Sequence, residues 1–419
     1  MIGNQNIPKL RFPGFDGAWE TKSVYELASK LNVGFVGTCE PFYTNSSEGI
    51  LLVRTGNLKG VNIVLDEEKY VSKEFHNKNK KSQIFPGDLL LARHGGNGEI
   101  CMVPKEFPAA NCLNIVILKT NSLLDSVFFQ LAYSSYSVQK QISSVTAGST
   151  QGVINTKEIG KLNIIFPSLP EQQKIASFLS AVDEKIQQLS RKKELLEHYK
   201  KGVMQQLFSG KLRFKDENGN EYPEWEEKKL GDIGIFQTSS IDKLSKENEL
   251  EVYLVNYMNV YRHEEINNNT IKHFQVVTAK ENQIRSCDLR KGDILFTPSS
   301  ETPTDIGHSV VIFEDIENAV YSYHLMRFRP KLKMDILYSH YFCNIPEVLN
   351  QLSKLATGST RFTISVKSFS SIEVKLPCFN EQQKIANFLS SIDAKIENTK
   401  GELEKVQLFK KGLLQQLFV

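Results

Sequence analysis

Two stretches of the chain decide the fold: residues 171–186 read EQQKIASFLSAVDEKI, and residues 381–396 read EQQKIANFLSSIDAKI. They are identical at 12 of 16 positions at an offset of 210 residues, which chance does not produce. Self-similarity of this kind is the signature of an internal duplication. The chain is therefore expected to contain two copies of one structural unit.

Further matches extend the duplication to most of the 419 residues. The beginnings of the copies share Lys-Leu-Arg-Phe, at residues 9–12 and 211–214. Their ends share Gln-Gln-Leu-Phe, at residues 205–208 and 415–418. The first copy therefore ends near residue 208, and the second begins a few residues later.

The middles of the copies, residues 31–145 and 235–355, align poorly. A duplicated chain that keeps its ends and changes its middles has one shared role and two separate ones. We interpret the ends as a common frame and the middles as two different recognition domains. Short β-rich runs between clusters of Gly, Asn and Pro predict a mixed α+β fold for each middle. The predicted strands are 50–54, 61–65, 114–118, 161–166, 251–256, 309–313 and 371–376, and the predicted helices are 125–143 and 334–355.

From residues 171 and 381 onward the apolar residues recur every seven positions, which predicts two long helices. A helix of 38 residues would span about 57 Å. One copy cannot bury such a seam alone, so the two helices are expected to pack against each other, antiparallel. The predicted seam comprises Ile175, Val182, Leu189, Leu196 and Val203, flanked by Phe178, Leu179, Ile186, Tyr199 and Leu207, and in the second copy Ile385, Ile392, Thr399, Val406 and Leu413.

The expected fold class is α+β. We predict two mixed α/β recognition domains separated by two long antiparallel coiled-coil helices, in a pseudo-two-fold tandem repeat. The predicted parts are the first domain at 1–167, the central helix at 168–209, the second domain at 210–377 and the C-terminal helix at 378–419.

Composition limits the partners and the compartment. With 51 basic and 48 acidic residues the net charge is +3, so any binding of nucleic acid must come from local patches or from a more basic partner. The six cysteines are irregularly spaced without a CxxC pair, which favours free thiols over a zinc site. No run approaches the ~20 apolar residues of a membrane span. We expect a soluble, cytoplasmic protein with no metal or cofactor of its own.

The sequence carries no motif of an enzyme active site. It contains neither type of nucleotide-binding glycine loop, nor the Asp/Asn-Pro-Pro-Tyr/Phe element of an amino-methyltransferase. Asp88 recurs as Asp293 in a Gly-Asp turn, and we interpret both as structural rather than as part of a nuclease carboxylate pair. The chain is therefore expected to be non-catalytic.

Features suited to DNA lie mainly in loops. Residues 77–81 form a basic, amide-rich segment, although such charge runs are commonly just solvated. The Gly-rich residues 93–99 form either a turn between strands or a contact loop.

Two equivalent loops differ in their last residue, as expected if the two copies read different DNA sequences. Residues 148–151 are Gly-Ser-Thr-Gln, and residues 358–361 are Gly-Ser-Thr-Arg. Gln suits adenine N6/N7 and Arg suits guanine O6/N7, while a turn whose hydroxyls contact phosphate is an equally good interpretation. The DNA-binding candidates are Lys78, Lys80, Lys81, Arg93, His94, Asn97, Ser149, Thr150, Gln151, Ser299, Ser300, Thr304, Ser359, Thr360 and Arg361.

Outward-facing residues of the long helices are partly repeated between the copies, which a solvated face does not require. We interpret them as a surface that docks a partner, whereas the seam itself needs no role beyond that of a spacer. The docking candidates are Lys174, Lys185, Gln205, Gln206, Phe208, Lys384, Lys395, Gln415, Gln416 and Phe418.

The tandem arrangement, the Leu-Pro pairs at 169–170 and 376–377, the EQQKIA runs, the Asp-x-Lys-Ile step and the Gly-Ser-Thr loops resemble the specificity subunit of type I restriction-modification systems. The resemblance covers essentially the whole chain. One departure is that the second helix begins Cys-Phe-Asn, at 378–380, where the first has Ser-Leu-Pro, at 168–170.

The resemblance implies two target-recognition domains that each read one half of a bipartite, asymmetric DNA site, with the paired helices setting the unread gap. It also implies one copy of this chain per complex, docking two adenine methyltransferase subunits and, through them, restriction subunits. S-adenosylmethionine, ATP and Mg would belong to those partners.

Two other functions remain to be tested. A scaffold whose variable domains bind proteins instead of DNA would show no DNA affinity in the complete complex. A stand-alone nuclease or methyltransferase, which the missing motifs disfavour, would show activity in the isolated chain.

Overall fold

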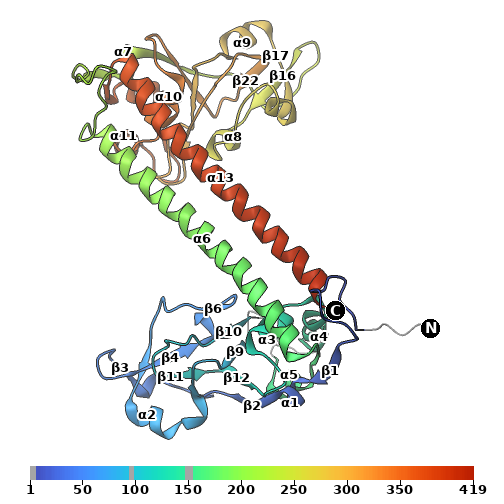
Figure 1. Ribbon diagram of the computed structural model, residues 1–419. Helices are drawn as coiled ribbons and strands as arrows, with labels where there is room; N and C mark the ends of the chain where they lie inside the picture. The colour runs from blue at the N-terminus through green and yellow to red at the C-terminus, as the bar shows by residue number, and fades with distance from the viewer. Residues whose placement is uncertain (1–5, 94–98, 147–153) are drawn as a thin grey trace. The chain divides into compact units, whose positions relative to one another are not determined.

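The computed structural model forms two compact units. Unit 1 comprises Met1–Ser190 together with Gly401–Val419, and unit 2 comprises Arg191–Lys400. Figure 1 labels the elements of both. The residues that the structure describes are 6–93, 99–146 and 154–419.

Unit 1 is built on two main sheets. The four-stranded sheet has the order β10-β9-β12-β2, and the five-stranded sheet has the order β3-β7-β4-β11-β8. Its strands are β1 (Glu20–Ser23), β2 (Ala28–Val33), β3 (Tyr43–Thr44), β4 (Ile50–Arg54), β5 (Leu58–Lys59), β6 (Asn62–Ile63), β7 (Tyr70–Val71), β8 (Gln83–Ile84), β9 (Leu89–Ala92), β10 (Ile100–Met102), β11 (Ala110–Leu113), β12 (Ile115–Thr120) and β13 (Asn163–Phe166). Its short helices are α1 (Val24–Leu27), α2 (Lys73–Lys78), α3 (Ser126–Tyr133), α4 (Tyr136–Thr146) and α5 (Thr156–Lys161), with 3-10 turns η1 (Glu40–Phe42), η2 (Thr55–Asn57) and η3 (Lys80–Ser82).

Unit 2 is also built on two main sheets, with the orders β15-β23-β19-β21 and β17-β16-β22-β18. Its strands are β14 (Glu226–Lys229), β15 (Gly234–Thr238), β16 (Leu250–Val255), β17 (Gln275–Ala279), β18 (Asp288–Leu289), β19 (Ile294–Phe296), β20 (Ser299–Ser300), β21 (Ser309–Val311), β22 (Ile316–Tyr321), β23 (Met326–Pro330), β24 (Phe362–Thr363) and β25 (Glu373–Leu376). Its short helices are α7 (Leu230–Ile233), α8 (Tyr257–Tyr261), α9 (Glu281–Ser286), α10 (Ile336–Phe342), α11 (Pro346–Leu355) and α12 (Val366–Ser370), with the 3-10 turn η4 (Thr270–His273).

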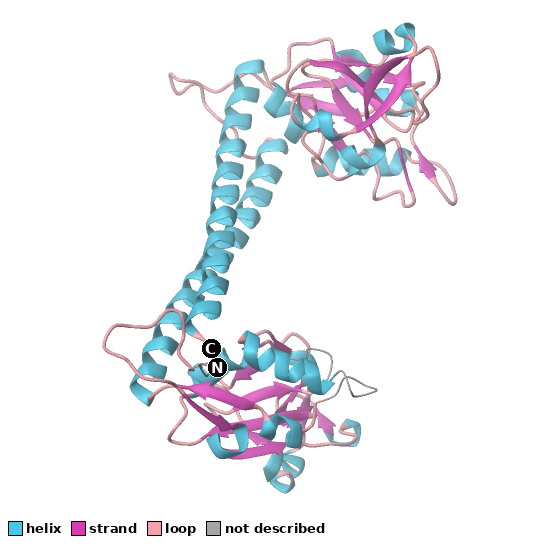
Figure 2. Ribbon diagram, turned by 90° about the vertical axis from the view of Figure 1, so that its right-hand side faces the viewer, coloured by secondary structure: helices cyan, strands magenta, loops and turns pink. Residues whose placement is uncertain are grey.

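The two units share one topology, although their middles do not align in sequence. The order β10-β9-β12-β2 in unit 1 corresponds to β21-β19-β23-β15 in unit 2, and β7-β4-β11-β8 corresponds to β17-β16-β22-β18. Each second sheet contains a parallel pair, β4 with β11 and β16 with β22. Figure 2 shows these strands in magenta. Residues 31–145 and 235–355, which align poorly in sequence, therefore share one order of strands. They differ in their side chains and in the connections between strands.

Both long helices are present and pack antiparallel. They are α6 (Leu169–Phe208, 40 residues) and α13 (Phe379–Leu417, 39 residues). In unit 1 the beginning of α6 meets the end of α13, where Lys410 forms an ion pair with Asp183. In unit 2 the end of α6 meets the beginning of α13, where Lys200 forms an ion pair with Asp393. The two ion pairs occupy equivalent positions of the repeat.

The predicted helical seam is confirmed except at one position. Ile175, Leu189 and Val203 of α6 are buried, and so is the polar seam residue Thr399 of α13, whose hydroxyl donates to a carbonyl one turn earlier. Tyr199 was assigned to the seam wrongly, because its side chain is 52 % exposed.

The two predicted helices of the middles are each interrupted. The segment 125–143 divides into α3 and α4, and the segment 334–355 divides into α10 and α11. Proline at the start of α11 restricts the preceding residue to extended backbone, so α10 has to end before it. The final strand of each copy is also shorter than predicted, because α5 and α12 occupy the chain ahead of β13 and β25.

A buried carboxylate marks the entry to each long helix. Glu171 is 1 % exposed and Glu381 is 0 % exposed. Arg11 donates from Nε and Nη2 to the two oxygens of Glu171, at 2.8 and 2.7 Å, and this hydrogen bonding raises the pKa of Arg11. Arg213 makes the same bidentate pair with Glu381, at 3.1 and 2.9 Å. The segment ahead of each domain is thereby fastened to its helix.

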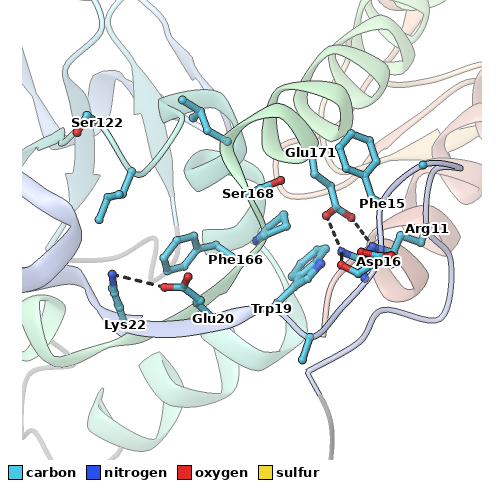
Figure 3. Close-up of a pocket in the computed structure, with 15 residues that line it drawn as sticks. Arg11, Phe15, Asp16, Trp19, Glu20, Lys22, Ser122, Phe166, Ser168 and Glu171 are labelled. Atoms are coloured by element: carbon cyan, nitrogen blue, oxygen red, sulfur yellow. Dashed lines mark hydrogen bonds and ion pairs between the residues drawn. The ribbon is translucent and has the colours of Figure 1, made fainter.

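Figure 3 shows the unit 1 ion pair in a cavity of about 570 Å³ at the start of α6. Arg11 and Glu171 lie on one side, Phe166 ends strand β13, and Ser168 comes from the turn that leads into the helix. Arg11 pairs with Glu171 and Lys22 with Glu20 at this cavity, so we assign the cavity a structural role.

The glutamine after each buried glutamate ties the helix to its domain. Gln172 donates to the carbonyl of Pro167 at 2.8 Å and accepts from the backbone N–H of Asp125, the N-cap of α3, at 2.8 Å. Gln382 makes the equivalent bonds to Pro377 and Asp335 at 2.9 and 3.0 Å. The repeated Glu-Gln pair thus serves the fold.

Replacing Glu381 with Gln should destabilise unit 2. The change leaves the guanidinium of Arg213, which is 17 % exposed, without its bidentate partner, and we expect a loss of about 2 kcal/mol in the free energy of unfolding, as for a hydrogen bond to a charged group. Trp225 donates to the same carboxylate at 3.0 Å, so tryptophan fluorescence in a Trp19→Phe background would follow the change during urea unfolding. Glu397→Gln, at an exposed position of the same helix, is the matched control; equal loss in both variants would contradict the role of the buried pair.

Candidate nucleic-acid interface

In unit 2 the structure joins two loops that are far apart in the sequence. Thr357 and Thr363 exchange backbone hydrogen bonds of 3.0 and 2.9 Å, which closes residues 358–362 into a tight turn. The strand β24 that follows pairs antiparallel with β20, with Ser299 opposite Thr363. The two predicted DNA-binding segments of this copy therefore form one surface.

Glycine is required at the beginning of this turn. Gly358 has a φ of +145°, and a Cβ built on it would lie 2.0 Å from the carbonyl oxygen of Arg361. Any side chain there would force the turn open. The glycine of the Gly-Ser-Thr-Arg motif therefore sets the position of Arg361.

Arg361 lies at the rim of an open pocket of about 270 Å³. One of its guanidinium nitrogens donates to the hydroxyl of Ser299 at 3.2 Å. The side chains of Tyr257 and Tyr261, both from α8, form one wall, stacked with a centroid distance of 5.8 Å and an interplanar angle of 18°. The pocket is lined by Tyr257, Met258, Tyr261, Ser300, Glu301, Asp305 and Arg361.

A chain of hydrogen bonds begins at two residues that line this pocket, Tyr261 and Asp305. Tyr261 donates its hydroxyl to Asp305 at 3.0 Å, and this bond raises the pKa of Tyr261. Nε2 of His308 lies 2.8 Å from Oδ1 of Asp305, and Nδ1 of His308 lies 3.2 Å from Nε2 of His263. Burial raises the pKa of Tyr257, whose hydroxyl donates to the carbonyl of Ser299 at 2.9 Å. Both tyrosines stay neutral at physiological pH.

The predicted residues of unit 2 differ in exposure. Arg361 and its neighbours Ser359 and Thr360 are exposed, and so is Thr304. Ser299 and Ser300 are buried in β20, at 8 % and 6 % exposure. These two serines can position Arg361 and the turn, but they offer little surface to a ligand.

Unit 1 has an equivalent backbone contact. The backbone N–H of Ile154 donates to the carbonyl of Arg93 at 3.3 Å, as Ile364 donates to Pro298 in unit 2 at 2.9 Å. Arg93, directly after β9, is therefore in contact with Ile154, as Pro298, after β19, is with Ile364. Five predicted DNA-binding residues of this unit lie outside the described residues: His94, Asn97, Ser149, Thr150 and Gln151.

The predicted basic segment of unit 1 belongs to a different region. Lys78 ends α2, and Lys80 and Lys81 begin η3, ahead of β8 at the edge of the five-stranded sheet. All three lysines are exposed. Arg93 instead follows β9 of the four-stranded sheet. These lysines therefore lie next to a different sheet from Arg93. Their role in DNA binding stays a prediction.

Two of the predicted docking residues need correction. Phe208 is 6 % exposed and packs on Tyr338, and Phe418 is 8 % exposed and packs on Phe128 and Trp19. Both side chains complete the core of a unit, because each long helix ends against a domain, so neither is available to a partner. Seven others are exposed, namely Lys174, Lys185, Gln205, Gln206, Lys395, Gln415 and Gln416, and Lys384 is half-buried with its amine bonded to the carbonyl of Lys215.

The sequence interpretation missed an aromatic pair on the long helices. Tyr199 and Phe409 occupy equivalent positions of the repeat and are 52 % and 55 % exposed. Leu408, beside Phe409, is 71 % exposed. The repeat offset of 210 residues could have indicated this pair, had Tyr199 not been assigned to the seam.

Other features have structural explanations. Asp88 accepts a hydrogen bond from the backbone N–H of Phe85 at 3.0 Å, and Asp293 accepts one from Arg290 at 2.8 Å, which confirms both as turn residues. Within the described parts of the chain, no group of three or more His, Cys, Asp or Glu residues is placed to hold a metal ion. None of the helices in those parts is long and apolar enough to cross a membrane.

Known proteins resemble the chain over its whole length. The type I restriction modification DNA specificity domain matches it twice, at residues 20–198 and 222–408. A putative type I restriction enzyme MjaX specificity subunit from Methanocaldococcus jannaschii is 24 % identical over 437 residues, which cover 99 % of this chain and 96 % of the relative. The EcoKI specificity subunit of Escherichia coli is 24 % identical over 357 residues, covering 82 % of this chain and 75 % of the relative.

Solved structures share the fold. The S subunit of a type I restriction-modification system from M. genitalium superposes with a TM-score of 0.57 at 18 % identity, over 98 % of this chain and 99 % of that one. The HsdS subunit from Thermoanaerobacter tengcongensis gives a TM-score of 0.52 at 15 % identity, over 97 % of each chain. The predicted tandem of two mixed α/β domains with long antiparallel helices is thereby confirmed.

Replacing Gly358 with Ala should open the turn that carries Arg361, since the new Cβ meets a backbone oxygen. We expect the amide of Thr363 to exchange its hydrogen at least about 10-fold faster, which corresponds to about 1.4 kcal/mol of lost protection, while the core strands of unit 2 keep theirs. Gly401→Ala, at a helical position with no atom within 4 Å of the added Cβ, is the control. Unchanged exchange at Thr363 would show that the turn tolerates a side chain.

Proposed function

The chain belongs to the family of type I restriction-modification DNA specificity subunits, and from this premise we propose that each of its units reads one half of a bipartite, asymmetric DNA site. The two copies of the repeat indicate which parts have which role. The parts that the two copies share form the frame, and the parts that differ form the readers.

One observation carries this proposal: both units make the same backbone contact next to their Gly-Ser-Thr motifs. The bond between Ile154 and Arg93 in unit 1 corresponds to the bond between Ile364 and Pro298 in unit 2. In the sequence, the motif just ahead of Ile154 ends in Gln151, and the motif just ahead of Ile364 ends in Arg361. Because these side chains suit adenine and guanine respectively, the two motifs are suited to two different half-sites.

The long helices are proposed to set the spacing between the half-sites. Both α6 and α13 run without interruption for 40 and 39 residues, and each begins at a buried Glu-Gln pair that fixes it to a domain. The length of a continuous helix is set by its number of residues. The proposed functional parts are the domains at 1–167 and 210–377 and the helices at 168–209 and 378–419.

The outer faces of these helices are proposed to dock two methyltransferase subunits, one for each copy of the repeat, and through them restriction subunits. Tyr199 and Phe409 support this, because exposed aromatic residues are enriched where proteins bind one another. Their equivalence in the repeat suits two identical partners. In unit 2, an open pocket of about 600 Å³ is lined by residues of both helices, among them Gln205 and Ile396.

The chemistry is proposed to reside in those partners. Transfer of a methyl group from S-adenosylmethionine, and DNA translocation and cleavage with ATP and Mg, would be catalysed by the methyltransferase and restriction subunits. One copy of this chain would direct them to the DNA site.

The first test is to map methylated adenines across a genome while the chain is expressed with its methyltransferase subunit. We expect one split motif that disappears when the chain is omitted. Exchanging residues 31–150 for those of another specificity subunit should alter one half of the motif and leave the other half and the gap unchanged. Methylation that does not depend on the chain would favour a scaffold that binds proteins.

The docking proposal predicts a stepwise loss of partners. Tyr199→Ala and Phe409→Ala should each weaken one methyltransferase site about 10- to 100-fold, the range for an aromatic hot spot, so native mass spectrometry should show one bound subunit instead of two. The double variant should bind none. Glu194→Gln, at an exposed position of α6 that faces away from Tyr199, is the control, and two bound subunits in all variants would contradict the assignment of this face.

A further inference from the structure

We propose that the pocket between α8, β20 and the Gly358 turn reads a G·C base pair, with Arg361 on the guanine and Asp305 on the cytosine. This assignment rests on the proposed function, and it adds the identity of one base pair in the half-site of unit 2. It also gives Asp305, a residue that the sequence did not point to, a role in specificity.

Asp305 is held in a fixed orientation. Its Oδ2 accepts the hydroxyl of Tyr261 at 3.0 Å, and its Oδ1 lies 2.8 Å from Nε2 of His308. The other ring nitrogen of His308 bonds to His263, which is anchored on the carbonyl of Ser309 at 3.1 Å. A side chain held at both oxygens loses little further freedom when it meets a ligand.

The carboxylate keeps the capacity to accept further hydrogen bonds. An ionised carboxylate has about four lone-pair sites, and two of them are occupied here. The side chain of Asp305 is 46 % exposed, and it lines the open pocket. At least one acceptor site therefore remains for a donor that enters from solvent.

Arg361 brings the complementary groups. A guanidinium carries five N–H donors in a planar fork, and the bond to Ser299 occupies one nitrogen while fixing the direction of the side chain. The remaining donors are left for acceptors of a ligand in the pocket that Arg361 lines. An arginine fork beside a fixed acceptor thus makes a pattern of two donors and one acceptor.

The major-groove edge of a G·C pair presents the matching pattern. Guanine offers two acceptors, O6 and N7, and cytosine offers the N4 amino donor. Arginine is the commonest bidentate partner of guanine, and aspartate accepts from cytosine N4. Thymine carries an acceptor and a methyl group where cytosine carries its donor, so a T there would leave Asp305 facing an acceptor.

The acidic residue also explains how the pocket would discriminate. When a duplex displaces water from the pocket, a carboxylate oxygen that meets no donor is left unsatisfied, which costs free energy. Asp305 would therefore penalise wrong sequences more than it strengthens the correct one. Tyr257 and Tyr261 fix the α8 wall of the pocket through their bonds to the Ser299 carbonyl and to Asp305.

The test compares variants in the complete methyltransferase complex by their rates on synthetic duplexes. We substitute each base pair of the unit 2 half-site in turn and measure methylation of each duplex. Arg361→Gln, which installs the residue of the first copy, and Asp305→Asn should each reduce discrimination about 10- to 100-fold at one and the same G·C pair. Arg361→Lys should keep the positive charge, and with it the overall affinity, but lose discrimination at that pair. Arg285→Gln, at an exposed ion pair elsewhere in unit 2, is the control.

The outcomes separate this proposal from the proposed function. If the variants keep the discrimination of the wild type, or alter two different base pairs, the pocket does not read a G·C pair, although the chain still selects the DNA sequence. If the wild-type complex shows no sequence preference that depends on the chain, the proposed function itself fails. A ratio of rates on two duplexes does not depend on the amount of folded complex, so partial unfolding of a variant does not imitate the expected result.

Discussion

The structure depends on a buried carboxylate and a buried amide at the beginning of each long helix. Glu171 and Glu381 hold the segment ahead of each domain through a bidentate arginine, while Gln172 and Gln382 hold the turn that leads into the helix and the N-cap of a short helix in the domain. A buried ion pair adds little net stability compared with apolar packing, but it admits few alternative geometries. It therefore specifies how helix, strand and entry segment meet.

This constraint explains which part of the sequence was kept in both copies. The EQQKIA run contains the buried Glu-Gln pair followed by the first core residues, Ile175 and Ile385, of the helix seam. Every residue of such a junction has several partners at once, so a change at one position leaves another group buried without a partner. An exposed side chain such as that of Arg361 has fewer partners within the fold. The same strand plan can then present Gly-Ser-Thr-Gln in one copy and Gly-Ser-Thr-Arg in the other.

The sequence predicted best what depends on local periodicity. The long helices and their seam follow from apolar residues at fixed spacing, and their antiparallel packing follows from duplication. The shared strand plan of the middles could not be predicted, because a sheet order such as β10-β9-β12-β2 is set by contacts between distant segments. The meeting of the loops at Pro298 and Ile364 has the same origin. Phe208 and Phe418 were misassigned because a heptad pattern does not show where a helix runs into a domain core, and Asp305 was missed because its partners Tyr261 and His308 come from separate segments.

The charge of the molecule bears on how affinity and specificity are divided. A net charge of +3 over 419 residues gives only weak general attraction to a polyanion. Phosphate contacts supply most of the affinity of DNA-binding proteins, and base contacts supply their selectivity. On the proposed function, a reader that binds weakly by itself is useful, because it does not hold the complex on unrelated DNA. The affinity then has to come from basic partners that surround the duplex, so that the choice of sequence and the strength of binding lie in different chains.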